Sequence, residues 1–597
     1  MTTDFKRVLI ANRGEIALRV VRACRDASLT SIAVYAEPDA GAPFARLADE
    51  ALPLRGTAPA DTYLDIATLL AAAGQAGAEA VHPGYGFLAE DAGFAQAVLD
   101  AGLAWIGPPP AVIRALGDKV AARAIAARAG APLLPGTNRP VASPAEAMRF
   151  AEEHGLPIAI KAAHGGGGRG LRVAREAGEV AGLFEAAVRE ARAAFGRGEC
   201  FVEAYVEHGR HVEAQVLADV HGDVLVAGTR DCTLQRRYQK LVEEAPAPFL
   251  TKAQRTTLER SAAAICLEAG YVSAGTVEFL LSPQGELSFL EVNTRLQVEH
   301  TVTEESADID LVRAQLLIAA GHPLAVAAGT RAAPRRHAIE FRINAEDPAR
   351  EFAPSTGPIT RFRPPSGPGI RVDSGVEAGS VVGRQFDSLL AKVVVTGRDR
   401  PQAIERARRA LREFDIAGVR TTLPFLRAVL AEPAFTAEDP GGFAVHTRWI
   451  EQDYLPAAAT AAAAVADENE DEDDDEIMIR VGRHWLAVAV PGLAQAREGP
   501  LALARQQARE RRQRAGQAAG DAVSAPMQGT VVRVTVTEGE QVDAGQVLAI
   551  VEAMKMENPL RAPHAGQVAG LRVSAGDTVA QGTVLCRVVP DVPCGPG

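Results

Sequence analysis

The run of residues 289–299 carries the densest set of side chains able to do chemistry. In an extended segment, the period of two places its five polar residues on one face: Glu291, Asn293, Arg295, Gln297 and Glu299. The acids and amides suit a hard cation such as magnesium, which prefers oxygen ligands. Arg295 could bind a small planar anion through two parallel hydrogen bonds. The apolar segment 277–280 places a further carboxylate, that of Glu278, on a nearby strand.

A second group of residues is suited to phosphates. Residues 157–161 form a short apolar strand that ends on Lys161, a run of glycines (165–168) follows it, and Lys119 opens a helix upstream. A strand lysine can place its ammonium on phosphates while glycine amides close over them as a lid. A flexible linker is the alternative, but linkers rarely lie between two buried strands. With the acids and the arginine, these residues describe a phosphoryl-transfer site.

Lysine is scarce in this chain, which makes each lysine informative. Only seven occur, so 56 of the 63 basic residues are arginine. A retained lysine marks a place where a compact ammonium or a nucleophilic amine is needed. The seven are Lys6, Lys119, Lys161, Lys240, Lys252, Lys392 and Lys555.

The lysine at position 555 lies midway between two copies of one pattern. Adding 37 to each position of the first copy lands on an identical residue in the second, so the region is built from two equivalent halves. Short strands broken by turn glycines predict a two-fold β-sandwich that presents Lys555 on a hairpin tip. A solvated surface lysine is the plain alternative. The first copy holds Ala525, Pro526, Gly529, Val531, Gly539, Val542, Gly545, Val547 and Leu548.

The elements that must position these residues begin with an α/β pattern. Strand and helix signals alternate from residue 7 to residue 73, which predicts a parallel sheet. Residues 12–15 and 82–88 are glycine-containing turns that follow strands, and a purely structural role is the alternative to a functional one. Because residues 7–88 contain neither a G-x-G-x-x-G nor a Walker lysine loop, a nucleotide must be held in another way.

Composition bounds the remaining possibilities. A chain of 597 residues suggests about four domains. The net charge of −12 offers no basic footprint for nucleic acid, and no apolar run is long enough for a signal peptide or a membrane span. Six cysteines without paired spacing suit reduced thiols in the cytoplasm. Residues 457–476 read as an acidic tether, 477–490 as a small hairpin and 501–514 as a basic helix; either of the last two could dock a partner.

Ordered motifs give residues 5–450 a resemblance to biotin carboxylases of the ATP-grasp superfamily. The motifs are residues 11–17, 82–88, 161–170, 235–240, 243–248, 291–300 and 342–347, while residues 552–557 resemble the biotin form of the biotinyl/lipoyl carrier family. The resemblance implies an α/β N-terminal domain (1–116), an ATP-grasp α+β domain (117–333), a mixed C-terminal carboxylase domain (334–450), a linker (451–521) and an all-β biotinyl sandwich (522–590). Tyr238, His164 and Thr301 depart from the residues expected of the family.

The resemblance also implies roles for single residues. The residues expected to bind ATP are Lys119, Lys161, Gly165, Gly166, Gly167, Gly168, Glu203, His211, Gln235 and Tyr238. The residues expected to bind magnesium or manganese are Glu278, Glu291 and Asn293. The groups expected to bind bicarbonate are Lys240, Arg295, Gln297 and the Val298 amide. Glu299 is expected to be the general base, ionised beside Arg295. Arg342 is expected to bind biotin, which is attached to Lys555.

The layout resembles the α chain of bacterial acyl-CoA carboxylases. Residues 451–521 number only 71, too few for a carboxyltransferase, so we expect that activity on a separate β subunit that holds the acetyl-CoA or propionyl-CoA acceptor. The expected partners include a biotin protein ligase and a second copy of the carboxylase part, in fatty acid biosynthesis. A pyruvate or urea carboxylating system, a non-catalytic biotinyl carrier and, more weakly, a lipoyl carrier are the alternatives; retention of Lys240, Arg295, Glu299 and Arg342 counts against a dead ATP-grasp domain.

Overall fold

In the computed structural model, the first strands of the chain form a parallel sheet in the order β3-β2-β1-β4-β5. The predicted parallel α/β pattern is therefore confirmed. Its strands are β1 (Arg7–Ile10), β2 (Thr30–Ala36), β3 (Glu50–Leu54), β4 (Ala80–His82) and β5 (Ala104–Trp105), and its helices are α1 (Gly14–Asp26), α2 (Pro43–Leu47), α3 (Ile66–Gln75), α4 (Ala92–Asp100) and α5 (Pro110–Gly117).

The two glycine-containing turns of this part meet each other. The Asn12 side-chain amide donates to the carbonyls of Pro83 (2.7 Å) and Tyr85 (2.8 Å). Gly84 has a φ of +63°, and a Cβ there would lie 2.8 Å from Asn12 Nδ2, so only glycine fits. The turns that follow β1 and β4 are thus one interlocked unit at the carboxyl edge of the sheet.

The structure describes residues 5–137, 139–162, 171–195, 197–328, 334–455, 476–481, 484–489, 521–525, 529–553, 556–580 and 582–590. The glycine run 165–168, His164, the acidic tether, the basic helix predicted at 501–514 and Lys555 lie outside these residues. The chain divides into two units, Met1–Ala458 and Ala459–Gly597. No helix among the described residues is long and apolar enough to cross a membrane.

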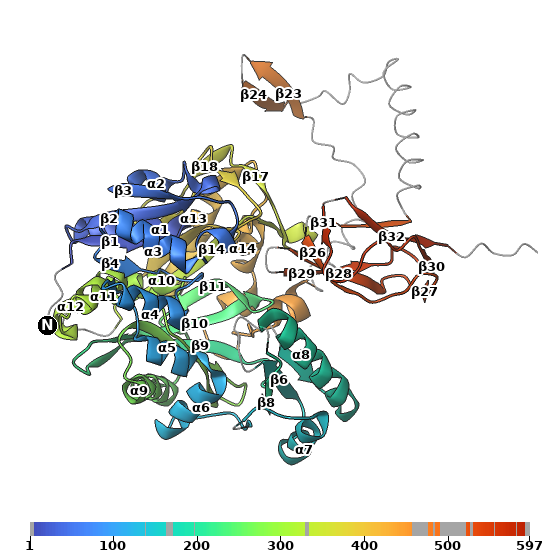
Figure 1. Ribbon diagram of the computed structural model, residues 1–597, viewed down its shortest axis with the longest axis horizontal. Helices are drawn as coiled ribbons and strands as arrows, with labels where there is room; N and C mark the ends of the chain where they lie inside the picture. The colour runs from blue at the N-terminus through green and yellow to red at the C-terminus, as the bar shows by residue number, and fades with distance from the viewer. Residues whose placement is uncertain are drawn as a thin grey trace, which may run out of the picture. The chain divides into compact units, whose positions relative to one another are not determined.

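An eight-stranded antiparallel sheet lies at the centre of the first unit (Figure 1), in the order β13-β12-β9-β10-β11-β14-β21-β19. Strand β11 pairs with β14, so one sheet runs through both the ATP-grasp and the C-terminal domains predicted from the sequence. The strands are β9 (Arg210–Ala218), β10 (Val224–Arg236), β11 (Gln239–Ala245), β12 (Ser273–Leu281), β13 (Leu287–Asn293), β14 (His337–Asn344), β19 (Ile370–Ser374) and β21 (Leu389–Gly397).

Helices cover this sheet and complete its cores. They are α6 (Lys119–Arg128), α9 (Lys252–Ala269), α10 (His300–Ala307), α11 (Leu311–Ala319), α13 (Arg400–Glu413) and α14 (Leu423–Val429). One apolar core joins β9, β12 and β13 with α6 and α9, and another joins β14 and β21 with α13 and α14. Asp118 caps α6 by accepting from the Ala121 amide at 2.8 Å, which confirms the helix start predicted beside Lys119.

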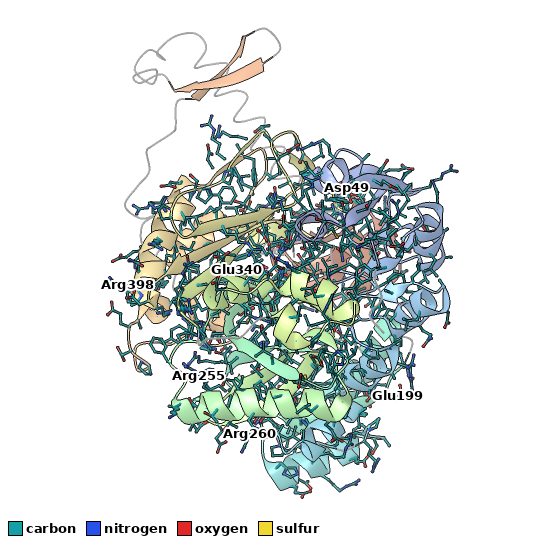
Figure 2. All side chains as sticks on the ribbon, turned by 90° about the vertical axis from the view of Figure 1, so that its left-hand side faces the viewer. Asp49, Glu199, Arg255, Arg260, Glu340 and Arg398 are labelled. Atoms are coloured by element: carbon teal, nitrogen blue, oxygen red, sulfur yellow. The ribbon has the colours of Figure 1, made fainter. Side chains whose placement is uncertain are left out.

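The interior of the sheet also holds charged side chains. In Figure 2, Glu340 of β14 lies inside the fold whereas Arg398 lies at its edge. Burial raises the pKa of Glu340 to about 8, and the Thr301 hydroxyl donates to its carboxyl group. Thr301, which departs from the family pattern, therefore gives a buried acid a hydrogen-bonding partner.

A small three-stranded sheet, in the order β7-β6-β8, carries Lys161 and Glu203. Its elements are β6 (Ile158–Ala162), β7 (Leu171–Ala174), β8 (Cys200–Ala204), α7 (Pro144–His154) and α8 (Val180–Phe195). The two strands predicted on either side of the glycine run are confirmed as β6 and β7, which pair antiparallel.

The C-terminal part of the second unit consists of two four-stranded sheets, β25-β32-β30-β27 and β29-β28-β26-β31. Adding 37 to β25 and β27 gives positions in β29 and β31, and subtracting 37 from β32 and β30 gives positions in β28 and β26. The two sheets therefore correspond strand for strand, which confirms the two equivalent halves. Strands β28 and β29 pair up to Ala553 opposite Met556, so Met554 and Lys555 connect them. The strands are β25 (Ala522–Ser524), β26 (Gly529–Val534), β27 (Gln541–Val542), β28 (Val547–Ala553), β29 (Met556–Arg561), β30 (Gly566–Ala569), β31 (Thr578–Val579) and β32 (Val584–Val589).

A separate antiparallel pair, β23 (Glu476–Val481) and β24 (His484–Ala489), is the hairpin predicted between the tether and the sandwich.

Candidate active site

Lys240 lies at the centre of a buried cluster of acids. Its ammonium is 2.6 Å from Glu299 Oε1, 2.8 Å from Glu213 Oε2 and 3.0 Å from Glu278 Oε1, and its side chain is 12% exposed. These groups come from β11, β9, β12 and the turn that precedes α10. The fold therefore gathers carboxylates from distant parts of the chain around one lysine, and the attraction between them raises the pKa of Lys240 well above its usual value despite its burial.

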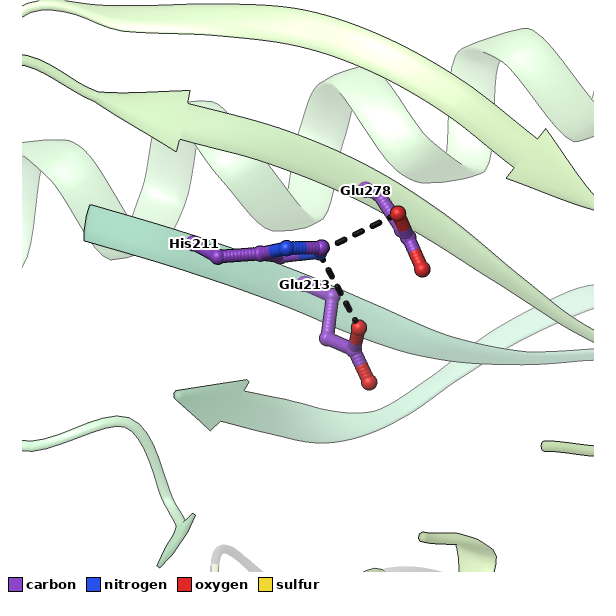
Figure 3. A group of neighbouring side chains, drawn as sticks. All are labelled: His211, Glu213 and Glu278. Atoms are coloured by element: carbon purple, nitrogen blue, oxygen red, sulfur yellow. Dashed lines mark ion pairs between the residues drawn. The ribbon is translucent and has the colours of Figure 1, made fainter. Parts of the chain in front are cut away.

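His211 belongs to the same cluster (Figure 3). Its Nε2 lies 3.1 Å from Glu278 Oε2 and 3.5 Å from Glu213 Oε2. Burial disfavours the charged ring, but Glu278 and Glu213 together outweigh burial and raise the pKa of His211 to about 9. These three side chains, with Lys240, form one buried, ion-paired network.

Glu299 is held by two cations, and Arg295 is neither of them. One carboxylate oxygen accepts from Lys240, and the other lies 2.8 Å from an Arg342 terminal nitrogen. Burial opposes ionisation, but the combined attraction of Lys240, Arg342 and Arg230 prevails and lowers the pKa of Glu299 to about 2. The pKa of Glu299 agrees with the predicted ionised carboxylate. The Arg295 Nε donates to Glu90 at 2.8 Å, and the charge of Glu299 contributes to the raised pKa of Arg295 without a direct hydrogen bond between the two residues.

The strand predicted over residues 289–299 is shorter than expected. Strand β13 ends at Asn293, and the chain then turns toward α10. Even so, the Asn293 and Gln297 amides both donate to Glu278 Oε1, at 2.8 Å and 3.1 Å. The polar residues thus converge through a turn around a buried acid, not along one face of an extended strand.

Glu278 and Glu291 form the candidate cation site. They lie directly opposite each other on β12 and β13, so their side chains share one face. Burial and the charge of Glu278 raise the pKa of Glu291, as expected for two close, buried carboxylates. Two acidic oxygens beside the Asn293 amide fit magnesium or manganese, which would be bound through oxygen.

The predicted phosphate lysines lie near this pair. Lys161 forms an ion pair with Glu203, which also accepts from Arg123 at 3.3 Å. Burial lowers the pKa of Lys119, and Glu291 is its principal opposing charge. This end of the site therefore combines ammonium groups with the two acids of the candidate cation site.

Gln235 and Tyr238 occupy different surroundings. The Gln235 amide nitrogen lies 3.5 Å from His211 Nδ1 and donates to the Cys232 carbonyl at 3.0 Å. Tyr238 lies on the turn between β10 and β11, with a φ of +66° and 41% of its surface exposed. The structure therefore brings Gln235 to the charged cluster but leaves Tyr238 at its margin.

Three buried residues of the site carried no predicted role. Arg230 donates to Glu213 at 2.5 Å, and Glu243 accepts from the Arg342 Nε at 2.6 Å. Burial raises the pKa of Glu243 to about 7 against the attraction of Arg342. The alternation of His211 with Glu213 along one strand was a signal for Glu213, and the motif 243–248 was a signal for Glu243, whereas nothing local marks Arg230.

Four protein-family models match the chain. Residues 4–113 match "Biotin carboxylase, N-terminal domain", 118–327 "Carbamoyl-phosphate synthase L chain, ATP binding domain", 340–452 "Biotin carboxylase C-terminal domain" and 521–588 "Biotin-requiring enzyme".

Several known proteins are similar. The biotin-dependent acyl-coenzyme A carboxylase alpha3 subunit of Mycobacterium leprae is 56% identical over 98% of this chain and 98% of its own. The mitochondrial pyruvate carboxylase of Rattus norvegicus is 48% identical over 72% of this chain and 37% of its own.

Among solved structures, a biotin carboxylase complex from Campylobacter jejuni is similar with a TM-score of 0.72 and 38% identity, over 75% of this chain and 98% of that one. A single-chain, multi-domain long-chain acyl-CoA carboxylase is similar with a TM-score of 0.65 and 36% identity, over 98% of this chain and 51% of that one. The similarity thus extends over both units of the chain.

Proposed function

We propose that this chain, which belongs to the biotin-dependent acyl-CoA carboxylase α subunits, has the function of that family. The protein is an ATP-dependent ligase that carboxylates biotin, which is the first half-reaction of an acyl-CoA carboxylase. The observation that carries this function is the buried cluster in which Glu299 is shared between Lys240 and Arg342 beside a pair of cation-binding acids. Biotin is carried on Lys555.

Bicarbonate binds near Lys240 and Arg295, with Gln297 and the Val298 amide as further donors. Because bicarbonate is itself an anion, it competes with Glu299 for Lys240 and raises the pKa of Glu299 from about 2 toward that of a useful base. Glu299 then takes the bicarbonate proton, and the oxygen attacks the γ-phosphate of ATP to give carboxyphosphate and ADP.

Glu278, Glu291 and Asn293 would hold magnesium or manganese, which would neutralise charge on the phosphates. Lys119, Lys161 and the glycine run hold the nucleotide, and closure of the run keeps water from carboxyphosphate, which breaks down to CO2 and phosphate. The glycine run lies outside the described residues, so its part stays a prediction.

Biotin, when attached, supplies the ureido nitrogen that takes up CO2. The sandwich suits that attachment because β28 and β29 are joined by a two-residue connection that contains Lys555. Arg342 is the residue we assign to the biotin ring, since its guanidinium already binds the carboxylates of Glu243 and Glu299 and is suited to a developing anion.

Carboxyl transfer takes place on a separate β subunit, with acetyl-CoA or propionyl-CoA as acceptor and fatty acid biosynthesis as the setting. The name of the M. leprae relative, an alpha3 subunit, supports this division. A pyruvate acceptor is the second candidate, supported by the similarity to pyruvate carboxylase over the carboxylase part.

The proposal has three further parts. A biotin protein ligase attaches biotin to Lys555. The carboxylase part forms a homodimer within a larger assembly, supported by the similar Hydrogenobacter thermophilus domain, which is described as a dimer. The protein works in the cytoplasm, supported by five buried cysteines without disulfides among the described residues.

Capture of the native protein on avidin resin tests the whole assignment. We expect a CoA carboxyltransferase to co-purify and the complex to fix bicarbonate in the presence of acetyl-CoA or propionyl-CoA. If the co-purifying partner were specific for pyruvate, the complex would instead synthesise oxaloacetate. If the protein failed to bind avidin, the assignment of biotin to Lys555 would be wrong.

A further inference from the structure

Lys392 is a buried lysine that the proposed chemistry leaves without a role. It lies on β21, is 0% exposed, and its ammonium donates to the Val298 carbonyl at 2.6 Å. In the sheet register it lies directly opposite Arg342 on β14, so both cations project from the same face. Arg342 binds the Glu299 carboxylate and Lys392 binds the carbonyl of the residue before it.

The second contact of Lys392 reaches the N-terminal parallel sheet. Its ammonium lies 3.2 Å from Glu15 Oε1, and Glu15 also accepts from the Tyr85 hydroxyl. Burial raises the pKa of Glu15, and Lys392 is the charge that most strongly opposes this rise. Glu15 is in the first turn of α1, and Tyr85 belongs to the turn that Asn12 holds. The two glycine-containing turns therefore meet the Val298 segment through a single lysine.

We propose that Lys392 is a positioning residue for the bicarbonate-binding turn 297–299. By holding the Val298 carbonyl, it sets the orientation of the peptide that leads into Glu299, while Glu15 and Tyr85 hold Lys392 in place. This inference rests on the proposed function, because it concerns the segment that we assign to bicarbonate.

Lysine suits this position better than arginine. A compact ammonium can donate to a carbonyl and a carboxylate at once, whereas a planar guanidinium is larger and has a fixed fork of donors. At a fully buried position the extra volume forces neighbouring side chains out of place. In a chain that uses arginine for 56 of its 63 basic residues, retention of lysine here follows from this geometry.

The test compares full-length Lys392→Met and Lys392→Arg with wild type in bicarbonate-dependent ATP cleavage with free biotin. We expect the KM for bicarbonate to rise about 10- to 100-fold in both variants, as for a small misplacement of a binding group. The KM for MgATP should stay unchanged, because Lys392 contacts no residue assigned to the nucleotide. Lys252→Met, at an exposed lysine that begins α9, is the matched control and should behave as wild type.

A purely structural role would lower the unfolding temperature of the Lys392 variants without changing the KM for bicarbonate, and that result would overturn the proposal. If neither variant folds, Glu15→Gln decides, because it removes the charge that holds Lys392 but keeps an acceptor. We expect a smaller rise in the bicarbonate KM of Glu15→Gln; a wild-type value would overturn the proposal. Absence of bicarbonate-dependent ATP cleavage in wild type would instead refute the proposed function.

Discussion

Replacing Glu299 by glutamine removes one negative charge from the centre of the site and keeps the shape of the side chain. In the native protein its carboxylate accepts from Lys240 at 2.6 Å and from Arg342 at 2.8 Å. Both cations keep other carboxylates after the change: Glu213 and Glu278 for Lys240, and Glu243 for Arg342. No buried charge is left unpaired, so we expect a cost in folding free energy of only about 1 to 3 kcal/mol.

The catalytic loss should be larger than that cost. A positioned general base contributes about 10²- to 10⁴-fold to a rate. This loss corresponds to about 3 to 5 kcal/mol of activation free energy. Because glutamine cannot take a proton at neutral pH, Glu299→Gln should lose bicarbonate-dependent ATP cleavage by that factor while it still folds and binds nucleotide.

The assay measures ADP release with and without bicarbonate, and nucleotide binding is measured separately on the same preparation. Glu268→Gln, an exposed acid paired with Arg128, is the matched control and should retain wild-type rates. Near-normal bicarbonate-dependent turnover in Glu299→Gln would refute the role of Glu299 as base and move the search to Glu243, which shares Arg342.

Three further predictions follow from the same geometry. Lys555→Arg should still carboxylate free biotin but transfer nothing to acyl-CoA, and any transfer by this variant would contradict the carrier assignment. Glu243→Gln should remove an ionisation near pH 7 from the pH profile of kcat/KM for bicarbonate, because burial raises the pKa of Glu243 to about 7. An unchanged profile would mean that Glu243 is not the group that ionises there. Arg400→Met should lower the free energy of unfolding by about 3 to 5 kcal/mol at neutral pH, because Arg400 donates to both oxygens of buried Glu244. Burial opposes ionisation of Glu244, but Arg400 lowers its pKa from 4.5 to about 2, so this stability is present above pH 4.5 and is lost as the pH falls toward 2. Urea unfolding of wild type and Arg400→Met across that range should show the difference narrowing, and a difference independent of pH would contradict this origin.

Several features were predictable because they depend on local patterns. The alternation of strands and helices predicted the N-terminal parallel sheet, and the 37-residue repeat predicted the two matching sheets of the second unit. Hydrophobic period and turn residues act over a few neighbours along the chain, so they can be read without a structure. The carboxylate of Glu278 was predicted near Glu291 for the same reason, and the two lie opposite each other.

The partners of the charged residues were not predictable in this way. The period of two placed Arg295 and Glu299 on one strand face, but β13 ends at Asn293, and Arg295 pairs with Glu90, 205 residues earlier. The contact of Lys392 with the Val298 carbonyl likewise joins segments 94 residues apart.

The sequence by itself determined the kind of chemistry, the order of the domains and the family, because these depend on which residues are present and on their spacing. Only the tertiary structure decided which cation neutralises which acid. Ion pairing depends on distance in space and on burial, and both are set by the order of strands in the eight-stranded sheet and not by position along the chain.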